Sequence, residues 1–139
     1  MAKIPKKTRY LVAKRAYFCC EYCSLQEKYS PDYFSVEHIL PRVKQGSDGF
    51  DNLAYSCLAC NSHKFISIEA LDPVSGILTP LYNPRIDIWE QHFFWSDDLS
   101  ILTGITPKGR ATIERLRLNR TSVVDIRVVL ADIGKHLVA

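Results

Sequence analysis

Four of the five cysteines form two Cys-x-x-Cys pairs, a spacing typical of zinc knuckles. Cys20 and Cys23 make the first pair, and Cys57 and Cys60 make the second. Four thiolates close a tetrahedral zinc site and leave no position for water, so the predicted zinc is structural. Cys19 also lies in the first knuckle, but only Cys20 has the two-residue spacing to Cys23. We interpret Cys19 as a small buried hydrophobic residue, with competition as a zinc ligand as the alternative.

Between and beside the two knuckles lie residues that a zinc site does not need. Glu37 stands next to His38, Asn52 follows, and Asn61 comes directly after the last cysteine. Carboxylate and amide oxygens bind hard cations, and a neutral imidazole is a suitable general base near pH 7. Each residue also has a plain structural interpretation: a packed or surface histidine at a strand end, a turn asparagine at 52, and a helix N-cap at 61.

The charge distribution favours a phosphate-bearing partner. The net charge is only +3, but six basic residues and no acidic one precede Glu21. A second basic group lies near the C-terminus. Such patches suit a nucleic-acid backbone, with solvated helix faces as the alternative, and near the knuckles Arg42 and Lys64 are candidate phosphate contacts.

The elements that must position these residues are short. We expect a basic N-terminal helix within residues 1–17 and a zinc-stapled core over 18–68. Within this core we predict a strand over 33–36 leading into Glu37, a long loop, a second strand or turn over 52–56, and a helix from near Asn61. A C-terminal extension over 69–139 contains a predicted hairpin over 89–105. It continues with a helix from Pro107 to about 118, N-capped by Thr106, and a last helix to about 137 started by a Ser122-x-x-Asp125 capping box.

These residues resemble the zinc-stapled form of the HNH endonuclease family. The resemblance rests on Cys20-Glu21-Tyr22-Cys23, Val36-Glu37-His38-Ile39-Leu40-Pro41-Arg42, Asp51-Asn52-Leu53 and Cys57-Leu58-Ala59-Cys60-Asn61-Ser62-His63-Lys64. The segments 89–95, 104–112 and 116–119 are similar to the tail of a compact bacterial branch of these proteins. The family implies an α+β fold with a ββα-metal core, and we expect one domain over 1–139.

The resemblance also implies roles for single residues. It makes His38 the general base that activates water, with Asn52 orienting it, and it makes Glu37 and Asn61 the ligands of a divalent cation, Mg²⁺ or Mn²⁺. Glu37 departs from the Asp or His of many members, and Gly46 stands alone where members often have a Gly-Gly pair. The expected reaction is metal-dependent hydrolysis of phosphodiester bonds in double-stranded DNA.

Two non-enzymatic hypotheses remain beside this one. A non-catalytic zinc-stapled nucleic-acid-binding module needs the thiolates and the basic patches but not Glu37, His38 and Asn61 together. A zinc-ribbon module for protein partners predicts an exposed apolar patch without the basic asymmetry. The longest apolar runs are too short for a transmembrane helix, and no apolar run follows the basic N-terminus, so we expect a cytoplasmic protein with no membrane partner. We also expect no organic cofactor.

Overall fold

The computed structural model describes residues 3–137 and divides the chain into two compact units. Unit 1 comprises residues 3–68 and 83–86, and unit 2 comprises 69–82 and 87–137. Residues 1–2 and 138–139, the outer ends of the predicted first and last segments, lie outside the described residues. The organisation as one domain stays a prediction. Among the described residues, no helix is long and apolar enough to cross a membrane.

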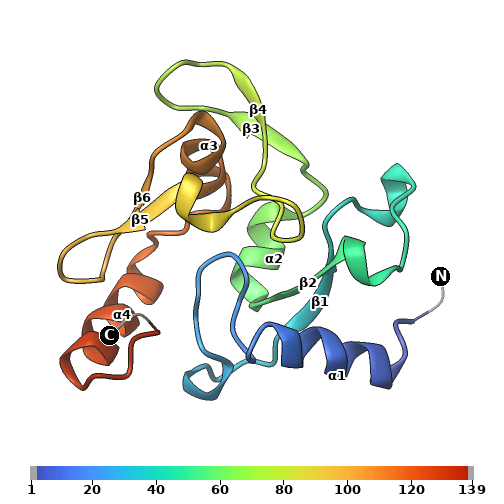
Figure 1. Ribbon diagram of the computed structural model, residues 1–139, viewed down its shortest axis with the longest axis horizontal. Coiled ribbons are helices and arrows are strands. Elements are labelled where there is room, and N and C mark those ends of the chain that lie inside the picture. The colour runs from blue at the N-terminus through green and yellow to red at the C-terminus, as the bar shows by residue number, and fades with distance from the viewer. Residues whose placement is uncertain (1–2, 138–139) are drawn as a thin grey trace. The chain divides into compact units, whose positions relative to one another are not determined.

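Unit 1 is built on a two-stranded hairpin that lies between two helices (Figure 1). Its main elements are α1 (Lys6–Arg15), β1 (Ser35–His38), β2 (Leu53–Ser56) and α2 (Leu58–Lys64). The strands are antiparallel, with Val36 opposite Tyr55 and His38 opposite Leu53. The order β1, β2, α2 is the predicted ββα arrangement, so the α+β fold class is confirmed.

The hairpin presents a different set of side chains to each helix. Neighbouring side chains on a strand point to opposite faces, so Glu37 faces α2 while His38 shares the other face with Val36. Tyr55, opposite Val36, packs its ring on Phe34 at 5.5 Å between centroids. On α1, Val12 is fully buried, which gives this basic helix a narrow apolar contact with the unit's core.

The long connection between the two strands contains two short 3₁₀ turns, η2 (Arg42–Lys44) and η3 (Phe50–Asn52). A third, η1 (Glu27–Tyr29), precedes β1. Helix α2 begins at Leu58, three residues before the predicted start, because Cys57 is its N-cap and its sulfur accepts from the Cys60 amide. The helix ends where Phe65 takes a left-handed φ of 51°.

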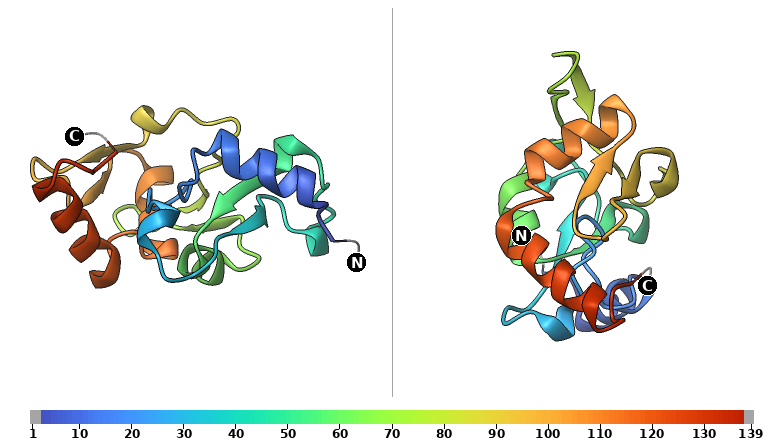
Figure 2. Two further views of the ribbon diagram at one scale, coloured as in Figure 1. Left: turned by 90° about the horizontal axis from the view of Figure 1, so that it is seen from below. Right: turned by 90° about the vertical axis from the view of Figure 1, so that its left-hand side faces the viewer.

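The described part of unit 2 contains two hairpins and two helices. They are β3 (Glu69–Leu71) with β4 (Leu78–Pro80), β5 (Phe93–Trp95) with β6 (Leu102–Gly104), α3 (Pro107–Leu116) and α4 (Thr121–Asp132); η4 (Trp89–Gln91) precedes β5. In the further views the chain of unit 2 runs from yellow-green to red (Figure 2). The predicted Thr106 cap is confirmed, since its hydroxyl accepts from the Gly109 amide. The predicted capping box is wrong: α4 starts after Arg120, makes no side-chain cap bond, and ends at Asp132.

Candidate functional site

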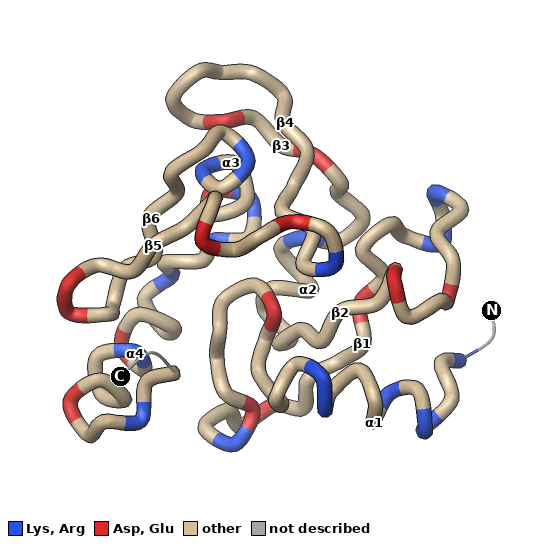
Figure 3. Tube along the Cα trace, viewed as in Figure 1, with Lys and Arg blue, Asp and Glu red and all other residues tan. Residues whose placement is uncertain are grey.

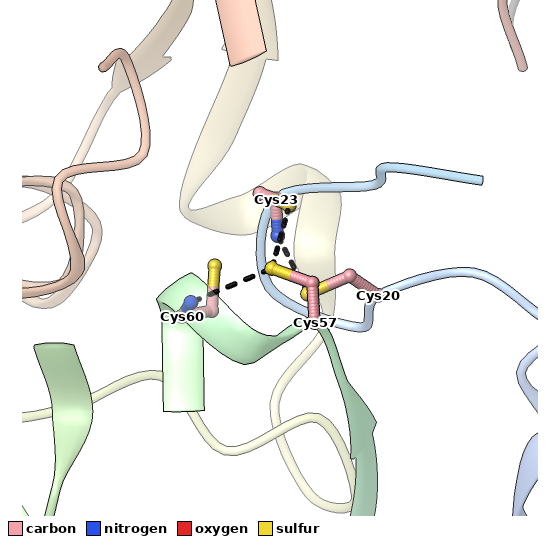
Figure 4. A group of neighbouring side chains, drawn as sticks. All are labelled: Cys20, Cys23, Cys57 and Cys60. Atoms are coloured by element: carbon pink, nitrogen blue, oxygen red, sulfur yellow. Dashed lines mark hydrogen bonds between the residues drawn. The ribbon is translucent and has the colours of Figure 1, made fainter. Parts of the chain in front are cut away.

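The four cysteines of the two knuckles converge on one point in unit 1 (Figure 4). Their sulfur atoms all lie within 4.8 Å of one another, and those of Cys23 and Cys57 are 3.7 Å apart. A tetrahedron with Zn–S bonds of about 2.3 Å places its sulfurs about 3.8 Å apart, so this cluster is consistent with a structural zinc. All four are buried and none forms a disulfide.

The sequence folds locally so that each knuckle presents its sulfurs inward. The first knuckle follows α1, and the second joins the end of β2 to the start of α2. Hydrogen bonding from Cys20 lowers the pKa of the Cys23 and Cys57 thiols, whereas burial raises the pKa of Cys20 and hydrogen bonding from Cys20 raises that of Cys60. Cys19 is buried outside the cluster, with its thiol toward the Tyr17 carbonyl at 3.3 Å.

His38 lies at the end of β1 and is oriented by a carboxylate that the sequence did not single out. Its Nε2 is 2.7 Å from Oδ1 of Asp48, and its side chain is 15 % exposed. Arg42 donates to both oxygens of Asp48, from Nε at 2.9 Å and from Nη2 at 3.0 Å. Arg42 and then His38 lower the pKa of Asp48 to about 2, so this carboxylate is ionised at neutral pH. His38 and Arg42 therefore share one acceptor at the surface.

Asn52 holds the loop that carries Asp48. Its Oδ1 accepts from the Leu40 amide at 2.8 Å, and its Nδ2 donates to the carbonyls of Leu40 and Ser47 at 3.0 and 2.7 Å. Gly46 lets the loop pass close to the backbone of Leu40, because a Cβ at position 46 would stand 1.6 Å from the Leu40 carbonyl oxygen. Asn52 thus bonds to the backbone of the loop beside His38.

Glu37 points the other way, into the interior between β1 and α2. Its Oε1 accepts from the ammonium of Lys64 at 2.5 Å, and its Oε2 accepts from the hydroxyl of Tyr22 at 2.7 Å. Glu37 is 5 % exposed and Lys64 2 %. Burial raises the pKa of the Glu37 carboxyl although Lys64 and Tyr22 act in the opposite direction. Both oxygens of the predicted metal ligand thus have protein partners.

Asn61 lies on α2 within reach of the same strand, where its Nδ2 donates to Oγ of Ser35 at 3.3 Å. Ser35 and Glu37 share a face of β1, so the structure brings Asn61 to the Glu37 side and leaves His38 on the other. A divalent cation held by Glu37 and Asn61 does not fit this arrangement, because the Lys64 ammonium takes Oε1. Lys64, predicted to contact phosphate, is buried and bonded within the protein.

Sequence reasoning missed Asp48 and Tyr22 as parts of the site. Asp48 stands in a loop between Gly46 and Gly49, ten residues after His38, and Tyr22 stands between Cys20 and Cys23. No motif spacing singles out these two residues. In the sequence they are only a possible hydrogen-bond acceptor and a possible donor. His63 is half-buried on α2. His92 belongs to unit 2, where its Nδ1 lies 2.6 Å from the Thr106 hydroxyl.

Comparison with known proteins identifies the segment that holds these residues. Residues 20–65 match the family model described as HNH endonuclease. The match spans the two knuckles, β1, β2 and α2, and it indicates a nucleic-acid-related function. It ends before unit 2, so the likeness of the segments 89–95, 104–112 and 116–119 to a compact bacterial branch stays a prediction. No curated protein and no solved structure matches the chain.

Proposed function

Because residues 20–65 belong to the HNH endonuclease family, we propose that this protein hydrolyses phosphodiester bonds of DNA with His38 as the general base. The observation that carries the proposal is the pairing of His38 with Asp48, 2.7 Å from Nε2 to Oδ1, at the surface end of β1. A carboxylate partner of this kind selects one tautomer of an imidazole and holds the ring in place.

The ionised Asp48 accepts the Nε2–H of His38, which leaves the lone pair on Nδ1. Nδ1 takes a proton from a water molecule as its oxygen attacks phosphorus. A new P–O bond forms, the bond to one ester oxygen breaks, and that oxygen receives a proton from solvent. Arg42, which shares Asp48 with His38, is the proposed contact for a phosphate bound beside the ring.

We retain Mg²⁺ or Mn²⁺ as the proposed cofactor, although its predicted ligands are engaged. Within residues 3–137, the four cysteines form the one group of three or more His, Cys, Asp or Glu ligands close enough to hold a metal. The proposed proton transfer by His38 therefore does not depend on the cation.

Double-stranded DNA is the proposed substrate, and α1 supports this choice. Lysine and arginine residues occur along α1 from its first residue to its last, and the helix contains no acidic residue (Figure 3). Arg15 at the end of this helix donates to the carbonyl of Leu53, which lies opposite His38 in the hairpin. A basic helix beside the strand pair that carries the proposed base suits a phosphate backbone that passes both.

One observation favours the alternative of a non-catalytic zinc-stapled nucleic-acid-binding module. The bond from Lys64 to Glu37 fills the position that the enzyme hypothesis assigns to a cation. A binding module needs neither that cation nor a free base, so it tolerates this pairing. The two functions differ in whether the wild-type protein cuts DNA or only binds it.

The test is nicking of supercoiled plasmid by zinc-loaded protein with Mg²⁺, with Mn²⁺ and with neither. We expect His38→Ala to lower the cleavage rate by about 10²–10⁴ and to leave DNA binding intact. His63→Ala, a histidine of the same unit outside the proposed site, serves as the matched control and should cut normally. Wild-type protein that binds DNA but never cuts it would establish the binding module instead.

A further inference from the structure

The interior of unit 1 contains an ammonium group in a setting usual for a metal ion. Lys64 is 2 % exposed, and its Nζ lies 2.5 Å from Oε1 of Glu37. The same Nζ donates to the carbonyl oxygens of Ile39 at 3.0 Å and His38 at 3.4 Å. Three oxygen atoms thus surround a group that has three protons to donate.

These three oxygens are also the kind that a hard cation takes. Mg²⁺ and Mn²⁺ bind carboxylate and carbonyl oxygens, with Mg²⁺ requiring distances of about 2.0–2.1 Å. A cation at that distance from Oε1 of Glu37 would stand within a few ångströms of Nζ. Two positive charges cannot share so small a buried space, because the low local dielectric strengthens their repulsion.

We infer that the Lys64 ammonium is the resident cation at Glu37 and that it competes directly with any divalent cation for this carboxylate. The inference rests on the proposed nuclease function for its choice of cation. It deepens that function by making Lys64 a built-in antagonist of metal binding. A cation reaches Glu37 only when Lys64 leaves all three acceptors.

The same ammonium fixes the backbone that carries the proposed base. Its two carbonyl acceptors belong to His38 itself and to the next residue, and Tyr22 holds the other oxygen of Glu37. Lys64 is therefore also a positioning residue: it ties the end of β1 to α2 without reaching the imidazole. Displacing it frees Glu37 and loosens His38 in one event.

The test measures Mn²⁺ binding by electron paramagnetic resonance on zinc-saturated protein, without DNA. We expect Lys64→Met to bind Mn²⁺ at least tenfold more tightly than wild type. Adding Glu37→Gln to that variant should abolish the gain. Lys14→Met, which removes an exposed lysine of α1, is the matched control and should leave Mn²⁺ binding unchanged.

A wild-type arm keeps the inference falsifiable if Lys64→Met does not fold. In the wild-type background, Glu37→Gln should leave Mn²⁺ binding as it was, since Lys64 already occupies the carboxylate. Tight Mn²⁺ binding by wild type that Glu37→Gln destroys overturns the inference, and so does a folded Lys64→Met protein with unchanged affinity. Plasmid nicking is scored separately, so a failure of the nuclease proposal does not alter the reading of the Mn²⁺ data.

Discussion

Breaking the buried pair of Glu37 and Lys64 should strongly destabilise unit 1, and a double-mutant cycle can measure the coupling between the two residues. Removing one partner of a buried ion pair typically costs about 3–5 kcal/mol, because the other charge stays buried without compensation. Lys64→Met leaves such a carboxylate, and it also deprives two backbone carbonyls of their donor. We expect Lys64→Met and Glu37→Gln each to lower the free energy of unfolding by about 3–5 kcal/mol.

The double variant should lose far less than the sum of the two single losses. Simple addition gives about 6–10 kcal/mol, whereas removing both charges leaves no uncompensated charge, so the double variant should lose at least about 3 kcal/mol less than that sum. Unfolding in urea should be followed by far-UV circular dichroism and by the absorption of Co²⁺ in place of zinc. Fluorescence is unsuitable, since both tryptophans, Trp89 and Trp95, belong to unit 2.

The pH dependence of Lys64→Met gives a second measure of the same pair. Burial holds the pKa of Glu37 above its ordinary value of about 4.3, and loss of Lys64 removes a group that lowers it. A carboxyl whose pKa is higher in the folded state than in the unfolded state contributes stability at low pH and loses it as the pH rises. The variant should therefore weaken relative to wild type above about pH 4. Additive losses, or a Lys64→Met protein as stable as wild type at pH 7, would refute the reasoning.

Three further outcomes are expected. Cys57→Ser should lose zinc and unfold unit 1, while Cys19→Ser should keep the zinc content of wild type by atomic absorption; zinc loss in Cys19→Ser would mean that the ligand set is wrong. Asp48→Asn should slow plasmid cleavage by at least tenfold with normal DNA binding, and unchanged cleavage would separate this carboxylate from the base. The hydrogen bond from Arg110, and then those from nearby groups in the turn, lower the pKa of Asp72 below its ordinary value. Because the ionised carboxylate stabilises the folded state, unit 2 should lose stability as the pH falls below about 4. By tryptophan fluorescence, Asp72→Asn should show a flatter acid profile, and an identical profile would contradict this assignment.

The local patterns of the sequence predicted the parts of the molecule whose geometry spacing controls. Two residues between paired cysteines fix the turn that aims both sulfurs at one point, so the ligand set Cys20, Cys23, Cys57 and Cys60 could be predicted without a structure. The order of two strands and a helix around them followed from residue type and turn signals. The short last helix and its missing cap were beyond such patterns, because Ser122 lies inside α4 and the helix starts at Thr121.

Only the tertiary structure decided which groups Glu37 and His38 contact. They are adjacent in sequence, but alternation along β1 sends one side chain toward α2 and the other toward the surface. A shift of one residue in register would exchange the two faces, and the sequence of a four-residue strand does not fix that register by itself. The contacts of Glu37 with Lys64 and of His38 with Asp48 join residues 27 and ten positions apart, so no spacing rule could pair them. The packing of α2 brings the buried Lys64 to the buried Glu37. The fold of the 40–49 loop brings the exposed carboxylate of Asp48 to the partly exposed imidazole of His38.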